Sequence, residues 1–228
     1  MVNNQDIIDH VSNLCEGTVF SDFEITRFDS GEVILSEKRN DVIRYLIMSF
    51  RLSEIGKSIN SISSSLMHSK LESFIEPIAT LNNLPYGASK ERTLTYSASE
   101  PKLYRKLTSE EVNNIDTYKG LIQKFVLDEI IPFFESRGTI EGLGEYVLQH
   151  PFDNIINIGL GGEYPVNLLK AITIAKWCGN EVKYEEYTKG LQTWIDEDRN
   201  DPNYAKMCDA YQGALDELKE KLSEHTLI

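Results

Sequence analysis

The chain has 228 residues, of which 41% are hydrophobic and 26% are charged, and its formal net charge at pH 7 is −13. This length allows one large domain or two small ones, and the apolar content is ordinary for a globular chain. An acidic surplus of this size repels phosphates, so we expect no binding to nucleic acid. No run of about 18 uncharged apolar residues occurs, so we also expect no membrane span.

The first part of the chain, residues 1–107, has a mixed pattern rich in strands. Residues 55–67 are ambiguous, because their apolar spacing is helical but their many serines disfavour a helix, and we expect a strand at their end. The other predicted elements are a helix over 4–16, a β-hairpin over 19–28 and 32–38 with a turn at 29–31, a strand over 42–52, a helix over 69–81 and an edge strand over 93–97.

The longest periodic stretch is 107–138. Thr108 and Glu111 form a capping-box pattern, and apolar residues then recur at three-to-four spacing, which predicts a long helix with one face in a core. Pro132 lacks a backbone N–H and clashes with the preceding turn, so we expect a kink or a break there. Arg137 and Gly138 supply a C-terminal signal.

The rest of the chain is predicted to be almost wholly helical, with helices over 140–148, 165–178, 182–194 and 203–222. Short links between helices make antiparallel neighbours. The sequence therefore predicts an α+β protein with an N-terminal antiparallel sheet and flanking helices, followed by a C-terminal antiparallel helical bundle. Residues 1–107 and 108–228 form either two parts or one continuous domain.

The acidic surplus belongs to the helical part. Residues 1–107 hold 14 acidic and 12 basic residues, whereas residues 108–228 hold 22 acidic and 11 basic residues. Such a surface favours basic partners, although the solvated faces of ordinary helices would have the same composition. The densest acidic run is Asp196–Asp201, where Asp196, Glu197, Asp198 and Asp201 are the binding residues that we predict. An EF-hand needs glycine and glutamate at its sixth and twelfth positions, and Asp201 and Met207 stand there, so we predict no calcium loop and no other metal site.

A glycine cluster, Gly159–Gly162, precedes the helix expected at 165–178. Glycines before a helix can bring backbone N–H groups to a phosphate. A dinucleotide fingerprint would need a further glycine where Tyr164 stands, and Glu163 would repel an anion. The cluster is therefore interpreted as a flexible turn, and no cofactor is predicted.

Basic side chains on the predicted strands suggest an alternative binding face. On one face of a sheet they could bind an anion or RNA, whereas in an alternating antiparallel sheet they would only face solvent. The acidic total favours the second interpretation. The residues concerned are Lys38, Arg39, Arg44, Arg51 and Lys57.

No local catalytic motif occurs in the chain. The four histidines are dispersed, and neither HExxH nor GxSxG is present. The cysteines, Cys15, Cys178 and Cys208, are odd in number and lack CxxC spacing, which argues against a disulfide scaffold or a zinc ribbon and makes a reducing cytoplasm the expected location. On apolar helix faces they are more typical of a core than of a catalytic site.

Three segments resemble uncharacterised bacterial α+β proteins, including toxin-immunity-type proteins. They are the hairpin at Val19–Lys38, IIPFFESRG at Ile130–Gly138 and LLKAITIAKWCGN at Leu168–Asn180. The resemblance implies an α+β fold and, for an immunity protein, a protein partner, but it carries over no functional residue.

The first functional hypothesis is accordingly a non-enzymatic binding module, of the immunity type, that neutralises a basic partner through its acidic surface. The second is an enzyme whose active site is assembled from residues distant in sequence. The third is a structural or oligomerising module with an apolar patch on its last two helices, formed by Tyr184, Tyr187, Trp194 and Tyr211.

Overall fold

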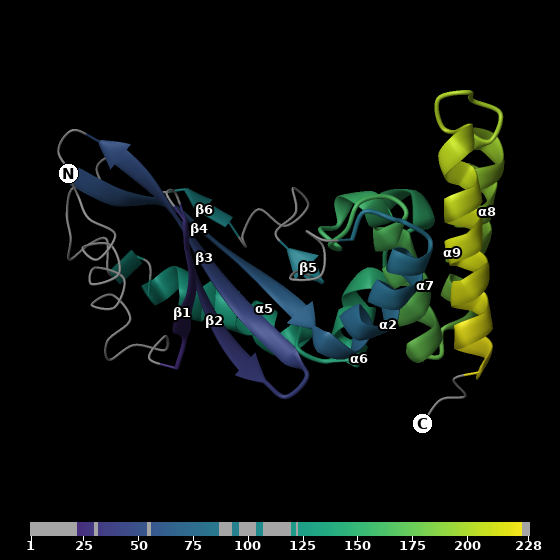
Figure 1. Ribbon diagram of the computed structural model, residues 1–228. Helices are drawn as coiled ribbons and strands as arrows, with labels where there is room; N and C mark the ends of the chain where they lie inside the picture. The colour runs from purple at the N-terminus through teal and green to yellow at the C-terminus, as the bar shows by residue number, and fades with distance from the viewer. Residues whose placement is uncertain are drawn as a thin grey trace. The chain divides into compact units, whose positions relative to one another are not determined.

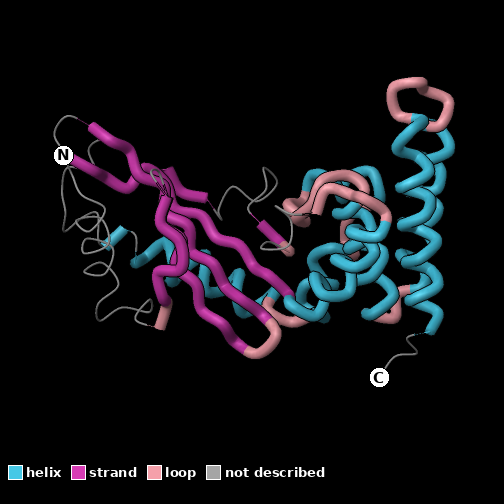
Figure 2. The backbone as a smooth tube through the Cα atoms, viewed as in Figure 1, coloured by secondary structure: helices cyan, strands magenta, loops and turns pink. Residues whose placement is uncertain are grey.

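The computed structural model describes residues 22–29, 32–53, 56–86, 93–95, 104–106, 120–121 and 123–224. The helix expected over 4–16, with Cys15, and the first turns of the helix expected over 107–138 lie outside these ranges. The chain divides into two compact units, each made of two segments. Unit 1 comprises 1–66 and 100–135, and unit 2 comprises 67–99 and 136–228. Figure 1 shows the course of the chain, and Figure 2 shows that most strands belong to unit 1 and most helices to unit 2. The protein is thus α+β, as the sequence predicts.

Unit 1 is built on an antiparallel sheet in the order β1-β2-β3-β4, with β6 paired to β4. The predicted hairpin is confirmed, and the turn between the second and third strands places Asn40 at a φ of 53°, a conformation that asparagine tolerates. The strands are β1 (Glu24–Asp29), β2 (Glu32–Arg39), β3 (Val42–Ser53), β4 (Gly56–His68) and β6 (Tyr104–Lys106).

Two strands differ from the expectation. The serine-rich stretch over 55–67, expected to be mixed with a strand at its end, forms β4 from Gly56 onward, so the strand extends further back than expected. Ser64 and Ser65 are both buried. Strand β6 lies between the edge strand predicted over 93–97 and the helix predicted over 107–138, in a stretch where no element is predicted above. It is three residues long, too short for a period-two pattern to mark it.

The buried face of this sheet is set by the pairing of β2 with β3. The register places Leu35 opposite Leu46 and Val33 opposite Met48, and these four side chains are almost completely buried. The guanidinium carbon of Arg44 lies 5.5 Å from the ring centre of Phe134. The helical segment that carries Phe134 therefore covers this face.

That helical segment continues through Pro132 instead of breaking there. A π-helical turn, η2 (Val126–Ile130), leads directly into α5 (Ile131–Arg137). Pro132, which has no backbone N–H, therefore lies just after the π-helical turn, where the hydrogen bonds run from each residue to the fifth one back instead of the fourth. The helix ends at Arg137, as the sequence predicts.

Unit 2 is organised around α7 (Val166–Trp177). Every residue from Val166 to Ala175 is buried, because α2, α6, α8, α9 and η3 all contact this helix. Glycine supports the close packing, since a Cβ at Gly144 would lie 2.4 Å from Cys178 Sγ. The elements around α7 are α2 (Ser69–Leu81), β5 (Leu94–Thr95), α6 (Ile140–Val147), η3 (Phe152–Asn157), α8 (Glu181–Asp198) and α9 (Ala205–Glu224).

The helices of the described ranges include none that is both long and apolar enough to cross a membrane.

Candidate functional site

The predicted binding residues lie at one end of the α8–α9 hairpin, so the position of α8 decides where they are presented. The helix starts directly after a turn at Gly179, whose φ is 68°. Gly179 N donates to Lys176 O at 3.0 Å and Asn180 N donates to Ala175 O at 2.9 Å, which is a Schellman motif that closes α7. The Asn180 side chain then accepts from Lys183 N at 3.0 Å and caps α8. One residue pair therefore ends one helix and starts the next.

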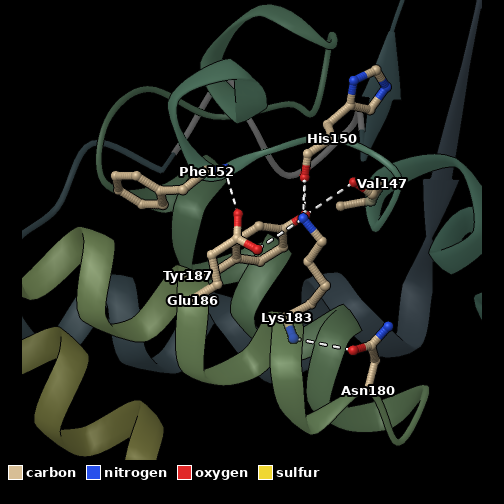
Figure 3. Close-up of polar contacts among 7 residues, drawn as sticks. All are labelled: Val147, His150, Phe152, Asn180, Lys183, Glu186 and Tyr187. Carbon is tan, nitrogen blue, oxygen red and sulfur yellow. Dashed lines mark hydrogen bonds and ion pairs between the residues drawn. The ribbon is translucent and has the colours of Figure 1, made fainter.

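Two side chains from the first turns of α8 bind carbonyl groups of Val147, the last residue of α6, and of His150, three residues beyond it. The Tyr187 hydroxyl lies 3.1 Å from Val147 O and 2.7 Å from His150 O, between which its single proton is shared. Lys183 Nζ donates to His150 O at 2.9 Å (Figure 3). Carbonyl groups that have no partner within α6 are thereby satisfied by α8.

The carboxylate of Glu186 completes this attachment. It accepts from Phe152 N at 2.9 Å and forms an ion pair with Lys183 Nζ at 2.9 Å (Figure 3). The Phe152 ring packs edge-on against Trp194, with 4.7 Å between the ring centres. A Cβ at Gly190 would lie 2.5 Å from the Phe152 ring, so only glycine fits there. The hairpin is therefore held in one place on unit 2.

The four predicted acids lie where α8 passes into α9, at the free end of the hairpin in Figure 1. Asp196 and Glu197 are exposed, and Asp198 and Asp201 are half-buried. Asp196 accepts from Gln192 Nε2 at 3.1 Å, whereas Glu197 projects from the last turn of α8.

Asp201 shapes the turn between the two helices. Its Oδ1 accepts from the backbone N of Asn203 at 2.8 Å and from the side chain of the same residue at 2.9 Å. Its carbonyl accepts from Ala205 N at 2.9 Å, at the start of α9. Asp201 therefore has a structural role as well as a charge. Within the ranges that the structure describes, no group of three or more acidic, histidine or cysteine side chains could hold a metal ion, and the acidic run is no exception.

Ion pairs neutralise only part of the hairpin. Residues 181–224 hold 12 acidic and 6 basic residues. Five of the acids form ion pairs: Glu181 with Lys176, Glu186 with Lys183, Asp209 with Arg199, Asp216 with Lys219 and Glu217 with Lys221. The remaining seven form no ion pair with a base in the described part of the chain: Glu185, Asp196, Glu197, Asp198, Asp201, Glu220 and Glu224.

Two apolar side chains stand beside the acidic run, a feature that the sequence did not reveal. Tyr204 is 47% exposed and Met207 is 40% exposed. Their spacing to Cys208 and Tyr211 in the helix predicted over 203–222 is typical of one apolar face, but α9 begins at Ala205, so Tyr204 lies before the helix and Met207 in its first turn. Cys208 and Tyr211 are buried, so this apolar face of α9 points into the core from Cys208 onward. The asparagine and proline that precede Tyr204 were the available signal that the helix starts late.

The aromatic patch expected for an oligomerising module is not formed as predicted. Tyr187 is completely buried and Tyr211 nearly so, while Tyr184 and Trp194 are half-buried. Tyr187 is turned inward by its hydrogen bonds to the end of α6. These aromatic side chains therefore mostly pack within unit 2 instead of forming an exposed patch.

A second cluster of polar side chains in unit 2 is wholly buried. Lys170 Nζ on α7 lies 2.9 Å from Glu72 Oε1 on α2. The Tyr86 hydroxyl donates to Glu72 Oε2 at 2.5 Å, and the Thr93 hydroxyl donates to Oε1. The backbone N of His68 donates to Thr93 Oγ1 at 2.9 Å. A single carboxylate thus joins two helices and two irregular segments.

The environment of this cluster makes its groups poor reagents. Burial is the largest influence on the pKa of Lys170 and lowers it, while the contact with Glu72 acts in the opposite direction. Burial, followed by the hydrogen bond to Glu72, raises the pKa of Tyr86 far above its ordinary value. The Lys170 side chain has no exposed surface, so it cannot reach a substrate. We assign the cluster a structural rather than a catalytic role in unit 2.

The other sequence candidates occupy structural positions. The backbone N of Gly161 in the glycine cluster donates to Thr93 O at 2.8 Å, so this amide is already hydrogen-bonded within the protein. Arg44 is buried against Phe134 and lies 3.4 Å from Glu37, with which it is paired across the strands. Lys38 is on the opposite face of the sheet, so these basic residues do not form one basic face. The side chains of Arg51 and Lys57 lie outside the described part.

Comparisons with protein-family models, with curated proteins and with solved structures find no match to this chain.

Proposed function

We propose that this protein is a non-enzymatic protein-binding module that recognises a basic protein through the acidic surface of its α8–α9 hairpin. The observation that supports the proposal is the set of seven hairpin carboxylates that form no ion pair with a described base. Ionised carboxylates on a rigid helical surface attract a basic partner and exclude an acidic one. They act over about 8 Å at physiological ionic strength, which speeds encounter but makes it salt-dependent.

The acids that we expect to contact the partner are Asp196, Glu197, Asp198 and Asp201. They come from one helix end and one turn, so they are close together in space as well as in sequence. The capping and carbonyl contacts of Asn180, Lys183 and Tyr187 fix the helix that carries them. A surface held in place before binding loses less conformational entropy when the partner docks.

An immunity protein of a bacterial cytoplasm is the type of binding module that we propose. Such a protein neutralises a toxin by binding it, and a toxin that acts on nucleic acid is basic because it must bind phosphates. The support is the charge of the hairpin together with the resemblance of Val19–Lys38, Ile130–Gly138 and Leu168–Asn180 to proteins of that type.

The test is affinity capture from an extract of the producing cells at low and at high salt, with the whole chain as bait. We expect a protein with an excess of lysine and arginine to be retained at low salt and released at high salt. The bait with Asp196→Asn, Glu197→Gln and Asp198→Asn should retain less of it. A matched bait with Glu185→Gln, Glu220→Gln and Glu224→Gln carries the same charge change away from the turn and should retain more. Capture that is equal with all baits, or insensitive to salt, would refute the proposal.

A further inference from the structure

We infer that Tyr204 and Met207 form the apolar anchor of the partner-binding surface, and that the partner presents an aliphatic or aromatic side chain flanked by arginine or lysine. The inference rests on the proposed function and adds the chemistry of the contact. Charge alone would accept any basic protein, whereas an apolar anchor selects a particular kind of segment.

The two side chains are both exposed at the start of the hairpin's second helix. Tyr204 is the residue directly before α9, and Met207 lies three residues later, in the first turn of that helix. Tyr204 N donates to Asp201 O at 3.0 Å and Met207 N donates to Tyr204 O at 2.8 Å. Met207 Sδ accepts from the buried Tyr211 hydroxyl at 3.4 Å. The backbone of both residues and the sulfur of one are therefore held before any partner arrives.

Their surroundings specify what can cover them. Asp196, Glu197 and Asp198 end α8, and Asp201 lies one turn before Tyr204. The two basic residues of this region do not cancel that charge. Arg199 is already paired with Asp209 at 2.7 Å, and Lys206 is a single base beside four acids. Protein interfaces typically have an apolar centre and a polar rim, and tyrosine and methionine are both enriched at interfaces. The complementary surface is apolar at its centre and basic around it.

Val182, another exposed apolar side chain of the same hairpin, lacks these surroundings. Val182 is 76% exposed at the start of α8, where its neighbours are Glu181, already paired with Lys176, and the base Lys183. A lone exposed apolar residue is ordinary on a protein surface. Val182 is therefore a suitable control for the effect of removing an exposed apolar side chain from the same hairpin.

The test uses two labelled synthetic peptides of equal length and charge, one of arginine and leucine and one of arginine and glycine. Their binding to the whole chain is followed by fluorescence anisotropy at low salt. We expect the leucine peptide to bind about tenfold more tightly, the effect of burying roughly one aliphatic side chain. The variant Tyr204→Ser, Met207→Ser should lose that advantage and keep its affinity for the glycine peptide. The variant Val182→Ser should behave as the unmodified chain.

Equal affinity of the unmodified chain for both peptides would overturn the inference and leave the proposed function in place. Binding of neither peptide would overturn both. Sedimentation of the chain alone gives the third outcome: self-association that the Tyr204→Ser, Met207→Ser variant loses would show that a second copy covers the anchor, and would also overturn the inference. Tryptophan fluorescence checks that each variant is folded, because Trp177 and Trp194 both belong to unit 2.

Discussion

Lys170 Nζ and Glu72 Oε1 are 2.9 Å apart in the interior of unit 2, with the two side chains 0% and 5% exposed. The pair links the central helix α7 to α2. Two buried charges attract strongly in such an environment, but each has lost its hydration, so a buried pair is weak evidence of stability until one partner is removed. The consequence can be measured.

Glu72→Gln should lower the free energy of unfolding by about 3–5 kcal/mol, because it leaves the charge of Lys170 buried without a counterion. Urea unfolding followed by tryptophan fluorescence measures this in unit 2, which contains both tryptophans. The double variant Glu72→Leu, Lys170→Met removes both charges and should recover part of the loss. If the double variant is no more stable than Glu72→Gln, the pair is not the source of the effect.

Stability should also depend on pH through His68. Its ring Nε2 donates to Arg137 O at 2.8 Å, and burial, the larger influence, lowers its pKa below the ordinary 6.5. The unfolded chain therefore takes up a proton at higher pH than the folded chain does. The contribution of His68 to stability is complete above pH 6.5 and declines as the pH falls below 6.5 toward the folded-state pKa, after which it levels off.

The variant His68→Gln isolates this contribution from the carboxylates that also titrate in acid. The difference in free energy of unfolding between the unmodified chain and His68→Gln should be constant above pH 6.5 and shrink below it. Parallel stability curves for the two proteins across this range would contradict the account.

Gly190 is a steric requirement of the α8 attachment. A methyl group there would meet the Phe152 ring at 2.5 Å, and that ring is held against Trp194. Gly190→Ala should therefore cost about 1–3 kcal/mol despite the higher helix propensity of alanine. Gly120→Ala is the control, because a Cβ at that helical glycine meets nothing within 4 Å, and it should not destabilise the protein. Thermal unfolding of both variants gives the comparison, and equal midpoints would refute the steric requirement.

The sequence predicts an element well where the pattern of a single segment is enough to define it. The helix over 69–81 has the predicted bounds, and the break at Gly179 is where the glycine and asparagine place it. The pairing of Glu72 with Lys170 could not be predicted, because it depends on how α2 packs against α7 and the two residues are far apart in sequence. Periodicity describes one helix at a time.

In the candidate site, too, some features could be predicted from the sequence and others could not. Asp196, Glu197, Asp198 and Asp201 stand out in the sequence as an acidic run, and the structure places them together at a helix end. The apolar spacing alone predicts that Tyr204 is buried, since it continues the spacing of the buried side of α9, whereas Tyr204 is exposed. Only the position at which the helix begins separates it from the core, and helix ends are the least certain part of a pattern.

The association rate constant with the captured basic partner is the most direct test of the central claim. Stopped-flow measurements over a series of salt concentrations would compare the unmodified chain with the Asp196→Asn, Glu197→Gln, Asp198→Asn variant and with the Glu185→Gln, Glu220→Gln, Glu224→Gln control. If the α8–α9 turn receives the partner, the rate constant falls with salt and the turn variant shows both a slower rate at low salt and a shallower dependence than the control. Identical rates and salt dependences for the two variants would show that the partner does not dock at the turn.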